Sequence, residues 1–128
     1  MGQATKEDAQ LLVQLARLGA DMKLGEASGF IWSGEFVEDY DEFKAKFPWG
    51  SEGAGHVAAV AGFNETVGTL VKHGLIDEEL VRDWLAFHLL WGKLEKILLG
   101  MREDAGEPRL YENFEAVATA QVEAPTPA

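Results

Sequence analysis

The residues from Glu78 to Met101 carry the longest regular apolar pattern in the sequence. Large apolar side chains recur there at alternating steps of four and three residues, at Leu80, Trp84, Phe87, Trp91, Leu94, Leu98 and Met101. Such spacing places these side chains on one side of an α-helix. Further apolar residues such as Leu85 and Ile97 widen that side, and a helix of this kind is typical of the interior of a bundle. The pattern therefore predicts one long, central helix over residues 78–101.

The remaining segments repeat the helical period, and none alternates regularly enough to predict a strand. Gly74 is expected to end one helix and Asp77 to cap the next, so the short link between them predicts an antiparallel hairpin. The other predicted helices cover residues 6–23, a short stretch that ends at Pro48, residues 54–73 and residues 109–121. Together they predict an all-α fold, a single up-and-down bundle of four to five helices over residues 1–120, with a disordered tail over 121–128.

The charge of the chain restricts its partners. Twenty-two acidic residues outnumber eleven basic ones, which gives a formal net charge of −11. A surface of this charge repels nucleic-acid phosphates and anionic lipids, so we expect no nucleic-acid partner. We interpret the acidity as a feature that keeps the protein soluble. The alternative interpretation is that the acidic surface binds a basic protein partner.

Cysteine usage and hydropathy bear on the compartment. The sequence contains no cysteine, which excludes disulfides, thiolate metal sites and cysteine nucleophiles. No apolar run reaches the roughly 20 residues that a membrane span needs, and the opening residues "MGQATKEDAQ" do not resemble a signal peptide. We therefore expect a cytoplasmic protein without stable membrane insertion.

No group of residues forms a recognisable catalytic or metal-binding set. The three histidines, His56, His73 and His88, are scattered along the chain, and no Glu-x-x-His pair of a di-metal bundle occurs. The glycine-rich stretch "SEGAGH" lacks the Gly-Lys-Ser/Thr ending of a phosphate-binding loop. The sequence thus predicts no catalytic residue, no cofactor and no metal.

One carboxylate nevertheless stands out. Glu65 lies in "AGFNETVG", among small residues that allow another helix to approach closely. A carboxylate in such a place needs a partner, because burying it unpaired is costly. We expect this partner to be Arg102, with Arg82 as the alternative, in an ion pair that fixes the register of two helices. The candidate polar cluster consists of Glu65, Arg102, Tyr111 and Glu115.

Aromatic residues suggest a second candidate site. Trp84 and Trp91 follow the helical spacing and are expected in the core. Trp49 follows Pro48 in a loop, and an exposed loop tryptophan is typical of a protein-binding surface. The candidate partner surface consists of Phe47, Trp49 and Tyr111.

Several runs of sequence resemble one family. The stretches "VGTLVKHGLIDEELVRDWL", "WGKLEKILLGMRE", "PRLYENFEAVA" and "YDEFKAKFPWGS" are similar to domain of unknown function family 4760, a prokaryotic helical family. The resemblance covers residues 9–118 and implies a helical fold, but no known activity. Many members begin with a transmembrane helix, whereas the first predicted helix here carries Gln10, Gln14 and Arg17 on its polar face. The matching positions are Glu65, Gly74, Leu75, Asp77, Glu79, Trp91, Arg102, Tyr111, Asn113, Phe114 and Glu115.

Two functions are compatible with these observations. The first is a small, non-enzymatic cytoplasmic protein-interaction or scaffold domain, which binds another protein or a second copy of itself as a dimer. The alternative is a small-molecule-binding or accessory enzyme domain. Its pocket would lie between the helices predicted over 54–73, 78–101 and 109–121, lined by Glu65, Arg102 and Tyr111.

Overall fold

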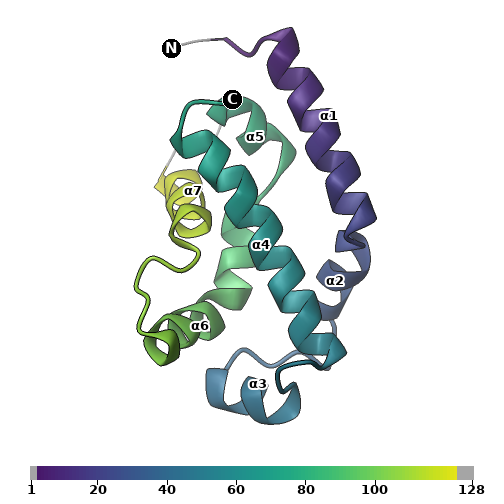
Figure 1. The fold of residues 1–128 in the computed structure, drawn as a ribbon, viewed down its shortest axis with the longest axis vertical. Helices are drawn as coiled ribbons and strands as arrows, with labels where there is room; N and C mark the ends of the chain where they lie inside the picture. The colour runs from purple at the N-terminus through teal and green to yellow at the C-terminus, as the bar shows by residue number, and fades with distance from the viewer. Residues whose placement is uncertain (1–2, 124–128) are drawn as a thin grey trace.

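The computed structural model describes residues 3–123, which form seven α-helices and no strand (Figure 1). The all-α prediction is confirmed, but the predicted count of four to five helices is too low. One helix was not expected, and the long helix predicted over 78–101 is divided in two. The helices are α1 Lys6–Asp21, α2 Leu24–Ile31, α3 Tyr40–Lys46, α4 Glu52–Lys72, α5 Glu78–Trp84, α6 Phe87–Ala105 and α7 Glu112–Glu123.

The unexpected helix is α2. The chain leaves α1 through Lys23, which has a left-handed backbone (φ 57°), and then turns into α2. Two glycines, at positions 25 and 29, weaken the helical pattern in this stretch of the sequence. They are exposed, whereas Ala27 and Ile31 on the same helix are buried. Packing of this apolar side against α4 stabilises the helix despite the low helix propensity of glycine.

The central helix of the fold is α4, and not the segment 78–101 as the apolar pattern predicted. In Figure 1, α4 crosses the middle of the molecule, with α1 and α2 along one side and α7 on the other. Its most extensive contacts are with α2 and α7, and nine of its residues are buried, compared with five in α6. Small residues such as Ala61 and Gly68 allow these neighbours to approach α4 closely. The large apolar residues of the sequence pattern therefore belong to two helices, and the longer of these, α6, packs chiefly against α7.

A break at Leu85 and Ala86 separates α5 from α6. Leu85 is extended (φ −128°, ψ 135°), and Ala86 precedes α6 without a side chain that can cap it. The side chain of Gln121 supplies the missing partners: its Nε2 donates to the Leu85 carbonyl (2.9 Å), and its Oε1 accepts from the His88 backbone N–H (3.2 Å). A residue from α7 thus satisfies backbone groups that a continuous helix would have paired internally.

A tertiary hydrogen bond connects the start of α1 to the start of α5. Asp8 closes a capping box with Thr5 at the start of α1, and its second carboxylate oxygen accepts from the Asp77 N–H (3.0 Å) before α5.

The last helix, α7, includes residues 121–123, so the predicted disordered tail begins too early. The rest of that tail, residues 124–128, lies outside the described residues. No helix within residues 3–123 combines the length and the apolar character that crossing a membrane requires.

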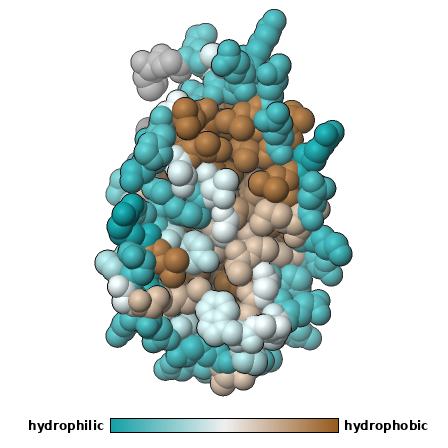
Figure 2. All heavy atoms as spheres, in the orientation of Figure 1, coloured by the Kyte–Doolittle hydropathy of each residue, from teal (hydrophilic) through white to brown (hydrophobic). Residues whose placement is uncertain are grey.

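Apolar side chains are concentrated on one part of the molecular surface. Figure 2 shows apolar side chains gathered over the upper half of one face, between α1 and the C-terminal half of α4. Half-buried Leu11, Leu12, Leu70 and Val71, from these two helices, pack on the core. Trp91 is buried as predicted, and Trp84 is half-buried against the ring of Phe63.

Candidate functional site

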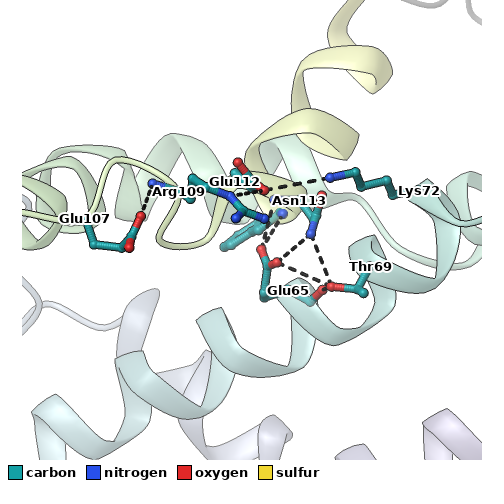
Figure 3. Close-up of polar contacts among 8 residues, drawn as sticks. Glu65, Thr69, Lys72, Glu107, Arg109, Glu112 and Asn113 are labelled. Carbon is teal, nitrogen blue, oxygen red and sulfur yellow. Dashed lines mark hydrogen bonds and ion pairs between the residues drawn. The ribbon is translucent and has the colours of Figure 1, made fainter.

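The Glu65 side chain lies at the N-terminus of α7 (Figure 3). Its Oε1 accepts from the backbone N–H groups of Asn113 and Phe114, both at 2.9 Å. Its Oε2 accepts from Asn113 Nδ2 (2.8 Å). The Thr69 hydroxyl lies 3.3 Å from the same oxygen and closer to the Glu65 backbone carbonyl (2.8 Å), which accepts its single hydrogen. Both carboxylate oxygens therefore have a short bond to at least one donor from Asn113. This set of bonds satisfies the carboxylate without a cation.

The predicted ion pair between Glu65 and Arg102 is wrong, and Arg82 does not replace Arg102. Arg102 donates from Nε to the Leu110 carbonyl (2.7 Å) and pairs through Nη1 with Glu115 (2.8 Å). Its guanidinium lies 5.7 Å from the Trp91 ring. Arg102 thus stabilises the turn before α7, while Glu65 caps the helix itself. The candidate polar cluster therefore consists of two separate interactions.

The start of α7 needs an external cap because of its own sequence. Tyr111, which precedes the helix, has a left-handed backbone (φ 59°) and lacks the short side-chain oxygen of a Ser, Thr, Asp or Asn cap. Glu65 instead bonds the two N–H groups that a capping residue would bond, and its charge favours the positive end of the helix dipole. Burial, and then the nearby Glu65 carboxylate, raise the pKa of the Tyr111 hydroxyl.

An apolar groove lies elsewhere, between α3, α4 and α6. It encloses about 240 Å³. Side chains from three separate parts of the chain line it, and they include Phe43, Phe47, Trp49, Val57, Ile97 and Met101. The lining is apolar apart from the Tyr40 hydroxyl, the Trp49 indole N–H and the Lys44 ammonium group. Trp49 is 73% exposed, so the groove has a large aromatic side chain at its open side.

Polar groups surround one end of this groove. The Tyr40 hydroxyl donates to Asp104 Oδ2 (2.6 Å), and Lys44 Nζ lies 3.2 Å from the same oxygen. Burial and the Asp104 carboxylate raise the pKa of Tyr40 to about 12. The hydrogen bond from Tyr40 and then that from Lys44 lower the pKa of Asp104. These contacts hold α3 against the C-terminal part of α6.

The structure brings together two of the three residues of the candidate partner surface. Phe47 and Trp49 both line the groove, and the predicted exposure of Trp49 is confirmed. Tyr111 is half-buried at the start of α7 and does not line the groove. Tyr40, Ile97 and Met101 also line the groove and were not predicted for this surface, because they come from segments far apart in the chain that no local pattern connects.

One protein family matches most of the sequence. A family model described as "Domain of unknown function (DUF4760)" matches residues 4–121. The chain therefore belongs to this family. A comparison with curated proteins and another with solved structures gave no significant match.

Proposed function

We propose that this chain is a non-enzymatic protein-interaction domain and that the groove between α3, α4 and α6 binds a segment of another protein. The observation that carries the proposal is the placement of the exposed Trp49 beside an apolar lining. Tryptophan is enriched among residues that contribute most to protein binding, and such residues lie next to apolar pockets. Phe47 and Pro48 extend the same surface.

The size of the groove favours a protein segment over a small molecule. At about 240 Å³, the groove is smaller than the roughly 300–1,000 Å³ of a usual small-molecule site. It has room for one or two large side chains. The alternative site near Glu65, Arg102 and Tyr111 has less support, because both Glu65 oxygens bond α7 and Arg102 pairs with Glu115.

A different protein is a better partner than a second copy of this chain. The net charge of −11 makes two copies repel each other. The absence of cysteine fits a reducing compartment, and we place the interaction in the cytoplasm. A hetero-complex is therefore the proposed assembly.

Two groove variants and one matched control test the proposal. Trp49→Ala removes the exposed aromatic, and Ala58→Arg places a charge on an exposed α4 residue that lines the groove. Trp32→Ala is the control, because Trp32 is also exposed (53%) and lies outside the lining. We expect a partner captured from cell extract, then purified, to bind the wild type and the control but neither groove variant in calorimetry. Capture of no specific partner, or equal binding by all four proteins, would contradict the proposal.

A further inference from the structure

The ammonium group of Lys44 lies at one end of the groove. Lys44 Nζ lies 3.2 Å from Asp104 Oδ2 and 3.9 Å from Asp41 Oδ1. It also lies 4.4 Å from the centre of the Tyr40 ring. Two carboxylates and an aromatic face therefore surround one ammonium group, an arrangement that attracts cations electrostatically.

The contacts of Lys44 are weak enough to be exchanged. The side chains of Lys44 and Asp104 are 44% and 55% exposed, and that of Asp41 is 91% exposed. Exposed ion pairs contribute little to stability, because water and salt screen them. Replacing Lys44 with another cation at this position thus costs little in folding free energy.

The local charge balance favours an incoming cation. Asp41 and Asp104 carry two negative charges against the single positive charge of Lys44. The other cation of α3, Lys46, donates from its Nζ to the Glu35 carbonyl (2.9 Å) and lies 5.4 Å from the centre of the Phe47 ring, so it makes no ion pair with Asp41 or Asp104. The whole chain is acidic as well, with a net charge of −11. An acidic surface next to an apolar groove is complementary to a basic, apolar segment.

We infer that the segment bound by the groove is basic and amphipathic. It inserts a large apolar side chain beside Trp49 and Phe47, and it places a lysine or arginine against Asp104 and the Tyr40 ring in competition with Lys44. This inference rests on the proposed function and specifies the chemistry of the partner. It also gives Lys44 a role: by occupying the cation position, it lowers the affinity of the free groove for basic segments.

Selection of peptides tests this chemistry without a known partner. A phage-displayed library of random peptides is selected on the full chain, with Trp49→Ala protein present as a soluble competitor. The peptides that emerge are synthesised with a fluorescent label, and their binding is measured by anisotropy. We expect them to combine a large apolar residue with at least one lysine or arginine.

Two charge variants of the protein then distinguish the cation from the apolar contact. Asp104→Asn keeps the oxygen that accepts from Tyr40 but removes the charge, and we expect it to weaken binding roughly two- to fivefold. Lys44→Met keeps an unbranched apolar chain up to the ε position and removes the competing ammonium group, so we expect tighter binding by a similar factor. Neither variant should change the binding of a peptide whose cation is replaced by glutamine.

The outcomes separate this inference from the proposed function. Groove-dependent peptides that are neutral or acidic, or that ignore both charge variants, would overturn the basic-segment inference and leave groove docking intact. Failure to select any peptide that discriminates wild type from Trp49→Ala would overturn both. A concentration-dependent dimer in light scattering that Trp49→Ala abolishes would assign the groove to a second copy and also overturn the inference.

Discussion

At the start of α7, the Glu65 carboxylate occupies the place that a capping side chain holds at most helix N-termini. The cap comes from a residue 48 positions earlier in the chain, as the bond from the Asn113 N–H shows. It joins α4 to α7 by hydrogen bonds to backbone groups, which are present in any sequence at that position. The identity of residue 113 adds the second contact, from its side-chain amide to Glu65 and to Thr69. The run "YENFE" thus has a structural explanation, because it forms the start of α7 and supplies the donors that bond Glu65.

Replacing Glu65 is expected to destabilise the fold in proportion to the acceptors lost. Glu65→Ala leaves two backbone N–H groups without their partner, and we expect a loss of about 2 kcal/mol in the free energy of unfolding. Glu65→Gln keeps one oxygen for those N–H groups, so its loss should be smaller. Urea denaturation measures both, with Glu95→Ala on the exposed side of α6 as the control. Equal stability of Glu65→Ala and wild type would show that the cap is not needed.

At the scale of elements, the distance between α4 and α7 depends on one small residue. A Cβ atom added at Gly68 would lie 2.6 Å from the Asn113 carbonyl oxygen. The backbone fixes the position of a Cβ atom, and the atom that it would meet is also part of the backbone. Rotating a side chain therefore cannot relieve the contact. The same helix contains Gly62, where an added Cβ meets no atom within 4 Å. Two glycines on one helix therefore have opposite expected responses to the same substitution.

Alanine substitutions at these two glycines test the close packing of α4 and α7. We expect Gly68→Ala to destabilise the protein by about 1–3 kcal/mol, because α7 must move away. We expect Gly62→Ala to stabilise it by about 0.5–1 kcal/mol, because alanine favours the helix. Thermal and urea unfolding of both variants give the comparison. A stabilising Gly68→Ala would show that the two helices do not approach as closely as described.

At the scale of the whole molecule, both tyrosines connect segments that are distant in the sequence. The chain contains two tyrosines in all, Tyr40 and Tyr111. Tyr40 joins α3 to α6 through Asp104, and Tyr111 lies between the turn after α6 and α4. The pKa of each is raised, to about 12 for Tyr40, and burial is the first cause for both. Their ionisation therefore reports on the assembly of the fold.

The protein is expected to lose stability in alkali through these tyrosines. An unfolded tyrosine loses its proton near its ordinary pKa of 10.0, while Tyr40 in the folded chain keeps it up to about pH 12. Between these values the unfolded chain binds fewer protons, so the free energy of unfolding decreases as the pH rises, and the contribution is complete below pH 10.

Absorbance at 295 nm measures the titration directly in the native protein. We expect no tyrosine to ionise at the ordinary pKa until the chain unfolds. Tyr40→Phe should show a smaller decrease in stability over the same alkaline range than the wild type. An identical decrease in the two proteins would assign the alkaline loss to other groups.

The sequence by itself determined the helical class, most helix boundaries and the exposure of Trp49. These properties follow from local rules, since periodicity, a capping aspartate such as Asp77 and a glycine such as Gly74 act over a few residues. The same local rules could suggest that Glu65 needed a partner, because its neighbours in the chain are small.

Only the tertiary structure decided which partner Glu65 has, where the long apolar segment breaks and which residues form the groove. A basic side chain is one possible hydrogen-bond partner for a carboxylate, but the backbone N–H groups at a helix start bind it equally well. Because every residue except proline has a backbone N–H, the residue types do not reveal such a partner. The break at Leu85 depends on Gln121, and the groove depends on Tyr40, Trp49, Ile97 and Met101 meeting in space. Contacts between segments so far apart arise from packing, which a one-dimensional pattern does not contain.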